Sequence, residues 1–132
     1  MFVDTSVIVA ILADEPDAGT YADKLAAADR RYTSGLVVLE AAMRLSSLLN
    51  VDPVEVERRI TQVLQAGEMT IVPIDAEIAR QAVAAFARYG KGRGHKAQLN
   101  LADCMSYACA QVMDMPLLYK GNDFSATDIR AA

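Results

Sequence analysis

The chain opens with Phe2-Val3-Asp4-Thr5-Ser6-Val7, in which an apolar pair is followed at once by three residues typical of a helix start. Asp, Thr and Ser side chains accept hydrogen bonds from the free N–H groups of a first helical turn. The pattern therefore predicts a short strand that leads directly into a helix over residues 7–12. A helix that follows a strand without a long loop favours an α/β protein.

Strand-like and helix-like segments continue to alternate along the chain. The β-branched or apolar segments predict strands at residues 31–33, 69–74 and 116–119. Helical periodicity and capping residues predict helices at residues 18–28, 36–49, 53–65, 76–89 and 99–113. The predicted fold class is α/β with a mainly parallel sheet, in one domain over residues 1–132.

Composition limits the possible functions. The chain has 132 residues, of which 53% are hydrophobic and 23% charged, and its formal net charge is −4. This hydrophobic content excludes a disordered tail, and the acidic balance argues against a surface that attracts nucleic acid everywhere. A nuclease with acids at a metal site and a few bases at its rim stays compatible with these values.

The same composition predicts a cytoplasmic protein. The only two cysteines, Cys104 and Cys109, lie in one helix-like run and are too few for a disulfide framework. No run of 18 apolar residues is present, so no membrane-spanning helix is expected. The apolar start lacks the basic region of a signal peptide. Apolar positions such as Met43, Leu48 and Met69 are interpreted as core.

Four acidic residues occupy unusual positions. Asp4 follows the first predicted strand and Asp123 follows the last, whereas Glu40 and Asp103 lie in largely apolar helical segments. The carboxyl ends of parallel strands meet at one sheet edge, so these acids can converge there. Carboxylates without Cys or His are ligands for Mg²⁺ or Mn²⁺, and such a site favours phosphoryl transfer with a metal-activated water.

Three of these acids also have ordinary structural interpretations. Asp4 is a good helix cap, and Glu40 stands four residues before Arg44, a spacing that favours an exposed ion pair. Asp123 follows Gly-Asn, which is turn chemistry. Asp103 is harder to explain in this way, because its neighbours are apolar on both sides. The residue pattern alone leaves both interpretations open.

A basic cluster precedes the Asp103 helix. Lys91, Arg93, His95 and Lys96 stand in a glycine-rich segment that is predicted to be a loop. Such a loop could hold RNA phosphates near the acids, which positions a nucleic acid without reading its sequence. The alternative is a solvated mobile loop with no ligand.

The four acidic segments resemble the PIN-domain family, and specifically the VapC-type toxins of bacterial toxin–antitoxin pairs. Residues 2–7 are similar to the first motif, residues 38–41 to the second and residues 100–108 to the third. Residues 118–129, which begin Leu-Tyr-Lys-Gly-Asn-Asp-Phe, match the closing motif. The resemblance spans the chain from end to end.

The resemblance implies a PIN-like α/β/α sandwich and an endoribonuclease that depends on Mg²⁺, with Mn²⁺ as a substitute. Together with the placement of the acids, it assigns the metal to Asp4, Asp103 and Asp123, with Glu40 completing the catalytic site. The residues expected to support the carboxylates by hydrogen bonds are Thr5 or Ser6, which would bond Asp4, and Asn122. The residues expected to bind RNA are Lys91, Arg93 and Lys96.

The resemblance also implies partners. A cognate VapB-type antitoxin would cover the acidic cleft with its C-terminal segment, and an Arg or Lys side chain would pair with the carboxylates. The expected substrate is a structured cellular RNA such as tRNA or ribosomal RNA. Toxins of this kind commonly form homodimers, and no membrane association is expected.

Three other classes of protein remain as alternatives. A haloacid-dehalogenase-like phosphatase needs a second Asp two residues after the first, where this chain has Ser6. A receiver-like signalling domain uses an adjacent acid pair, which Asp4 lacks, although Lys120 at a strand end favours it. A degenerate PIN domain that binds without cleaving is the third, but all four acids are present.

Overall fold

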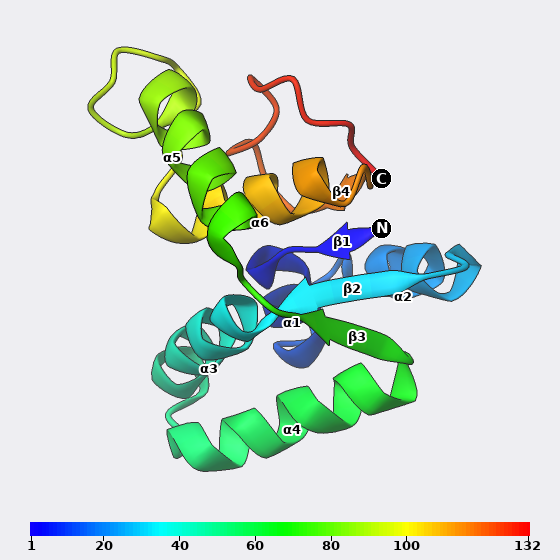
Figure 1. Cartoon of the computed structure of the whole chain (residues 1–132). Coiled ribbons are helices and arrows are strands. Elements are labelled where there is room, and N and C mark those ends of the chain that lie inside the picture. The colour runs from blue at the N-terminus through cyan, green and yellow to red at the C-terminus, as the bar shows by residue number, and fades with distance from the viewer.

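A parallel sheet forms the centre of the molecule, and the computed structural model describes all 132 residues. The sheet has four strands in the order β3-β2-β1-β4 (Figure 1). The strands are β1 (Phe2–Val3), β2 (Arg31–Ser34), β3 (Met69–Val72) and β4 (Leu117–Leu118). Every neighbouring pair is parallel, so the predicted α/β class with a mainly parallel sheet is confirmed.

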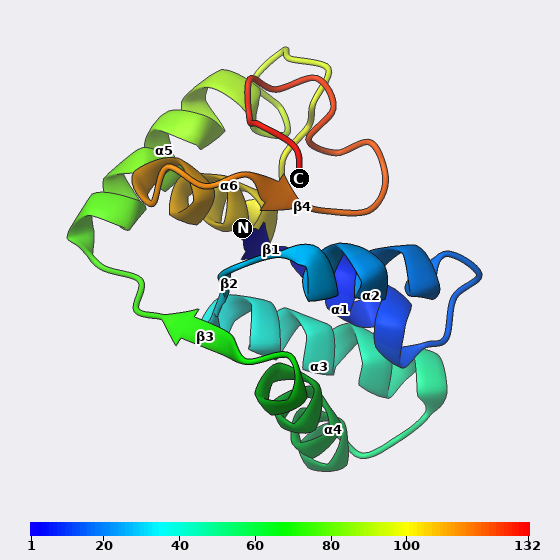
Figure 2. The same ribbon diagram turned by 90° about the vertical axis from the view of Figure 1, so that its right-hand side faces the viewer.

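Helices cover both faces of the sheet. They are α1 (Thr5–Leu12), α2 (Ala18–Ala27), α3 (Gly35–Leu49), α4 (Pro53–Ala66), α5 (Ala76–Tyr89) and α6 (Leu101–Val112). Figures 1 and 2 show α1 to α4 on one side and α5 with α6 on the other. Right-handed crossovers explain this division, because the chain moves from β1 through β2 to β3 and then returns past β1 to β4. The expected α/β/α sandwich is therefore present.

The direction of winding reverses at β1. Its neighbours β2 and β4 are reached through helices on opposite faces, and ligands of open parallel sheets bind beyond the strand ends at such a point. Strands β1 and β4 have two residues each, and all four of their side chains are essentially inaccessible to solvent. The backbone N–H of Asp4 donates to the Leu118 carbonyl at 3.0 Å, which fixes Asp4 beside the end of β4.

Two helices begin two residues away from their predicted starts. Helix α1 starts at Thr5 rather than at residue 7, because Asp4 already caps it. Helix α6 starts at Leu101 rather than at residue 99, because Leu99 extends the chain against the end of α5. The Leu99 N–H donates to the Tyr89 carbonyl at 2.9 Å, and its own carbonyl accepts from Lys91 at 2.9 Å. Because α6 starts at Leu101, Asp103 stands in its first turn.

Part of the predicted core is instead surface. Met69 is buried as predicted, but Met43 and Leu48 are each 62% exposed on α3. Met43 lies on the face of α3 away from the buried residues Ala41 and Leu45, whereas Leu48 follows Ala41 on the same face but stands in the last turn of the helix. No helix in the structure has the length and apolar composition needed to cross a membrane.

Helix α4 offers a matched test of the core. We expect Ile60→Ala, which truncates a fully buried side chain, to lower the free energy of unfolding by about 2–5 kcal/mol. The control Val54→Ala, at a 62% exposed position of the same helix, should change it by less than about 0.5 kcal/mol. Urea denaturation measures both values. Equal losses in the two variants would contradict the placement of α4.

Candidate active site

Asp4 follows β1 directly, and Ser6 in the first turn of α1 holds its carboxylate. Its Oδ2 accepts from the Ser6 backbone N–H at 3.0 Å and from the Ser6 hydroxyl at 2.7 Å. The Ser6 hydroxyl in turn accepts from the Lys120 N–H at 2.9 Å, so its own proton is directed to Asp4. The cap uses Oδ2 alone, and Oδ1 makes no hydrogen bond within the chain. Asp4 therefore caps the helix and keeps a free ligand atom.

Glu40 approaches from α3. Its Oε2 accepts from the Thr5 hydroxyl at 2.5 Å, and no ion pair joins it to Arg44. Thr5 is 1% exposed, so this bond fixes the carboxylate against the start of α1. Of the two hydroxyls offered as alternatives for Asp4, Thr5 or Ser6, it is Ser6 that bonds Asp4, whereas Thr5 bonds Glu40. The two hydroxyls reach different acids because adjacent residues at a helix start point in different directions.

Asp103 lies in the first turn of α6, not in the helix interior that the sequence pattern suggests. Its N–H donates to the Asn100 Oδ1 at 2.9 Å, and its own Oδ2 accepts from the Asn100 N–H at 2.9 Å. This reciprocal capping box orients the carboxylate. The support of Asp103 by Asn100 was not predicted from the sequence, although an Asn followed by Asp three residues later is the signal for such a box.

The other acids affect the ionisation of Asp103. The pKa of its carboxyl is raised from the ordinary value of 3.8 to about 6, and burial is the largest cause. The negative charges of Asp4, Asp123 and Glu40 also raise this pKa, whereas the hydrogen bond with Asn100 lowers it. The other three predicted acids are therefore close enough to disfavour charge on Asp103.

Asp123 and Asn122 are exposed on the loop after β4. The loop turns at Gly121, whose φ of +93° is a conformation that glycine adopts without strain. The Asn122 side chain makes no hydrogen bond to a carboxylate, and its backbone carbonyl instead accepts from Ser125. The expectation that Asn122 supports the site by a hydrogen bond is therefore wrong, because the loop turns its side chain to solvent.

The four carboxylates do not form a tight metal cage. No three His, Cys, Asp or Glu side chains are grouped closely enough to hold an ion as they stand. Their chemistry nevertheless fits a divalent cation, because carboxylate oxygens are the ligands that Mg²⁺ and Mn²⁺ prefer. Asp4, Glu40 and Asp103 each keep one oxygen free of hydrogen bonds within the chain. A cation would have to draw these groups closer together.

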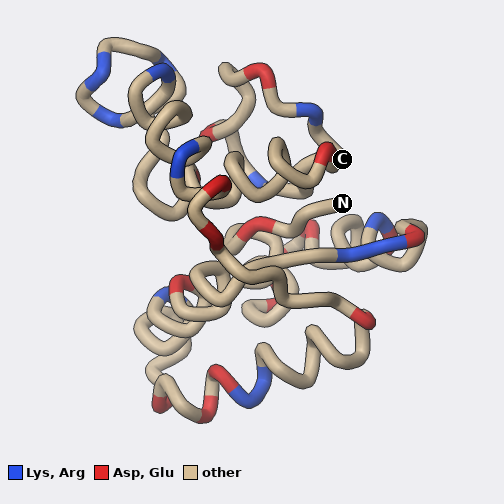
Figure 3. Tube along the Cα trace, viewed as in Figure 1, with Lys and Arg blue, Asp and Glu red and all other residues tan.

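The predicted RNA-binding residues lie on the loop between α5 and α6. Lys91, Arg93 and Lys96 are all exposed, and Figure 3 shows basic residues without acidic ones on this loop. Its base is fixed rather than free, since Lys91 and Arg93 donate backbone hydrogen bonds to Leu99 and Gly90. His95 packs edge-on against Tyr89 at 4.9 Å between ring centroids, so it serves the loop structure.

The Lys120 side chain makes no hydrogen bond or ion pair with the four candidate site acids. Its ammonium donates to Glu15 and to Asp17, which lie in the segment between α1 and α2. These hydrogen bonds raise the pKa of Lys120 and lower that of Asp17. The strand-end lysine that favoured a receiver-like domain is thus used to attach the β4 loop to the turn after α1.

Comparisons with known proteins agree with this geometry. The model of the PIN domain family matches residues 1–130. Ribonuclease VapC28 of Mycobacterium tuberculosis is 46% identical over all of this chain and 97% of its own length. Ribonuclease VapC of Mycolicibacterium smegmatis is 42% identical over 99% of this chain and 98% of its own length.

Solved structures share the fold. The Mycobacterium tuberculosis toxin VapC20, described as cleaving the sarcin–ricin loop, matches with a TM-score of 0.78 at 19% identity, over 99% of this chain and 97% of that one. A toxin–antitoxin complex from Klebsiella pneumoniae matches with a TM-score of 0.71 at 20% identity, over 96% and 92% of the two chains.

The burial of Asp103 beside other acids predicts a pH effect on the metal-free protein. The folded Asp103 carboxyl keeps its proton up to about pH 6, whereas the unfolded one loses it near 3.8. The folded state therefore binds more protons in this window, and its stability relative to Asp103→Asn should fall as pH rises from 4 to 6. The expected loss is on the order of 2–3 kcal/mol.

Urea denaturation of both proteins in EDTA, at several pH values, measures this difference. The Asn side chain keeps an oxygen for the Asn100 N–H, so the capping box remains in the control. Parallel stability curves for the two proteins would show that folding does not raise the pKa of Asp103.

Proposed function

Because this chain belongs to the PIN-domain family and is a VapC-type endoribonuclease, we propose that it hydrolyses RNA with Mg²⁺ or Mn²⁺ held at its four acidic residues, as the toxin of a toxin–antitoxin pair. One observation carries this proposal, namely that Asp4, Glu40 and Asp103 are each held by hydrogen bonds on one carboxylate oxygen and keep the other oxygen free. Four acids from distant segments would not be gathered at a sheet edge without a positive partner.

The role of each acidic residue follows from the hydrogen bonds that hold its carboxylate. Asp4 and Asp103, each fixed by hydrogen bonds on one oxygen, offer the other oxygen to the metal, and exposed Asp123 closes the site from the β4 loop. When bound, the metal supplies an activated water and positive charge for the phosphodiester oxygens. Glu40, held by Thr5, orients the attacking water.

The basic loop and the protein partners complete the proposal. Lys91, Arg93 and Lys96 hold phosphates of the RNA, for which a structured tRNA or ribosomal RNA is the proposed class. A cognate antitoxin neutralises the site by placing an Arg or Lys side chain among the carboxylates. We also propose a homodimer. Exposed apolar side chains of α3, such as Leu39 and Met43, are available for protein contacts.

Metal dependence and Asp103 are tested together. We expect the wild type to cut total cellular RNA at discrete sites with Mg²⁺ or Mn²⁺ and to stop in EDTA. Asp103→Asn should lower the rate by about a hundredfold or more, because it removes a charged ligand. The matched control Asp52→Asn changes another helix cap, on α4, and should cleave at the wild-type rate. Mapped RNA ends and initial rates are the measurements.

A second readout separates metal binding from cleavage. Mg²⁺ or Mn²⁺ should raise the melting temperature of the wild type and of Asp52→Asn but not that of Asp103→Asn, because a ligand that binds only the folded state stabilises it. Cleavage that persists in Asp103→Asn, or in EDTA, would overturn the assignment of the site.

The basic loop predicts a salt effect on RNA binding. We expect the triple variant Lys91→Gln, Arg93→Gln, Lys96→Gln to bind single-stranded RNA more weakly than the wild type in EDTA. The slope of log affinity against log salt should become shallower by about 0.7 for each phosphate contact that is lost. Fluorescence anisotropy over a salt series measures the slope.

The control for the basic loop lies on α4, where Arg58 and Arg59 are exposed and pair with Glu55. Replacing both by Gln should leave the slope unchanged. A slope that falls equally in the control, or does not fall in the loop variant, would show that the loop does not contact phosphates.

A further inference from the structure

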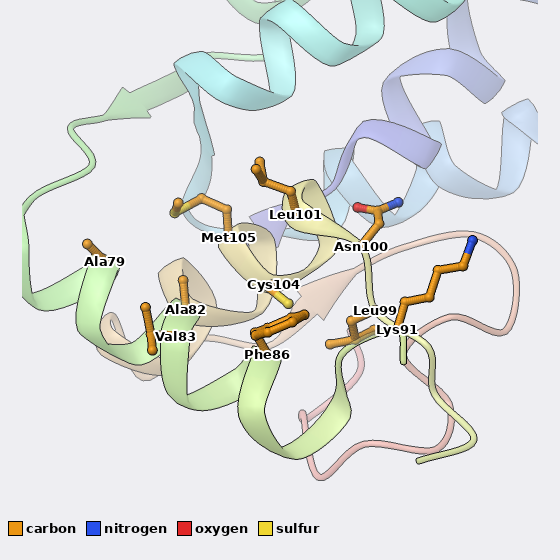
Figure 4. A pocket seen from close by; sticks show the side chains of 10 residues that line it. All are labelled: Ala79, Ala82, Val83, Phe86, Lys91, Leu99, Asn100, Leu101, Cys104 and Met105. Atoms are coloured by element: carbon orange, nitrogen blue, oxygen red, sulfur yellow. The ribbon is translucent and has the colours of Figure 1, made fainter. Parts of the chain in front are cut away.

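An apolar pocket of about 550 Å³ lies between α5 and α6. Ala79, Val83 and Phe86 form its wall on α5, and Leu101 and Met105 form the wall on α6 (Figure 4). The walls are open to solvent, since Leu101 is 71% exposed, Val83 68% and Phe86 47%. Large apolar side chains gathered at an open hollow are typical of a binding surface rather than of a core.

The pocket adjoins the acidic site through Asn100. This residue lines the pocket, caps α6 and holds the Asp103 carboxylate by its backbone N–H. The NH₂ group of its side chain makes no hydrogen bond within the chain and is free to donate. A ligand in the pocket therefore lies next to the group that fixes Asp103.

The other rim of the pocket is positively charged. Lys91 lines it, and Figure 4 shows the polar ends of Lys91 and Asn100 on the same side of the apolar side chains. The Arg93 guanidinium lies 5.8 Å from the centre of the Phe86 ring. A Cβ at Gly90 would come within 2.3 Å of that ring, so the basic loop packs directly against the aromatic wall.

We infer that this pocket receives one unstacked base of the RNA, beside the phosphodiester that is cleaved; the inference rests on the proposed function. A base has apolar faces that stack on an aromatic ring and a polar edge that hydrogen-bonds to side chains such as an amide. The Phe86 ring provides the stacking surface, and the Asn100 side-chain amide provides the hydrogen-bond donor. The phosphates of the same nucleotides then lie between the basic loop and the acids.

Charge favours RNA over an apolar protein segment as the occupant. Lys91 lines the pocket, the Arg93 guanidinium lies near its Phe86 ring, and the segment from Gly90 to Asn100 contains no acidic residue. Asn100 both lines the pocket and bonds the Asp103 carboxylate, so the pocket adjoins the proposed path from the basic loop to the acids. A purely hydrophobic partner would gain nothing from these cations, whereas phosphates would.

The test fills the pocket. Ala79→Phe places a ring in the cavity from an exposed position of α5, and the control Ala84→Phe makes the same change at an exposed position outside the pocket. The probe is a short random-sequence single-stranded RNA that carries 4-thiouridine, in EDTA. We expect about tenfold weaker binding for Ala79→Phe and wild-type binding for Ala84→Phe.

Two further readouts identify the contact. On irradiation, the wild type should cross-link to the probe through peptides that contain Phe86 or Leu101. Phe86→Leu, which keeps an apolar side chain without a ring, should bind about tenfold more weakly, and circular dichroism checks that it is folded. Equal affinities for Ala79→Phe and Ala84→Phe, or cross-links only outside these peptides, would overturn the inference.

Other outcomes separate this inference from the proposed activity. A change in sedimentation of Ala79→Phe without a change in RNA affinity would assign the pocket to a contact between two copies of the chain and overturn a base site. Weaker RNA binding by Ala79→Phe, with no metal-dependent cleavage by the wild type, would support the base site and overturn the metal mechanism. Metal-dependent cleavage that Ala79→Phe leaves unchanged would overturn the base site alone.

Discussion

Like charge at one edge of a sheet is the constraint on which the rest of this structure depends. Each of the three better-shielded carboxylates is held by a donor from a helix start: Ser6 for Asp4, Thr5 for Glu40 and Asn100 for Asp103. Two of these donors are neighbours in the first turn of α1, so one short helix serves acids from two parts of the chain. The helix starts thus offset part of the repulsion and leave one oxygen of each carboxylate free.

The sheet topology brings the four acids together with very short strands. Strands β1 and β4 have two residues each, yet their burial and pairing bring together segments from the two ends of the sequence. The reversal of winding at β1 leaves space beyond these strands, because the connecting helices diverge to opposite faces. The acids occupy that space from α3, α6 and the two strand ends.

Much of the fold could be predicted from local sequence signals. Strand positions, the helix over residues 76–89 and the caps at Ser34, Asp52 and Asp75 all follow from short-range rules. What could not be predicted depends on distant pairing. Leu99 leaves the helical pattern because it pairs with Gly90, and that moves Asp103 into a first turn. The exposure of Met43 likewise depends on which face of α3 its neighbours cover, which hydropathy alone does not reveal.

The bond between Ser6 and Lys120 has a consequence for protein synthesis. It joins residues 114 positions apart, and the orientation of Asp4 depends on it. A growing polypeptide that has already emerged through α5 still lacks the strand and the loop that complete the centre. The hydrogen bond that orients the Ser6 hydroxyl toward Asp4 can therefore form only after residue 120 has been synthesised, so the acidic site is completed late in translation.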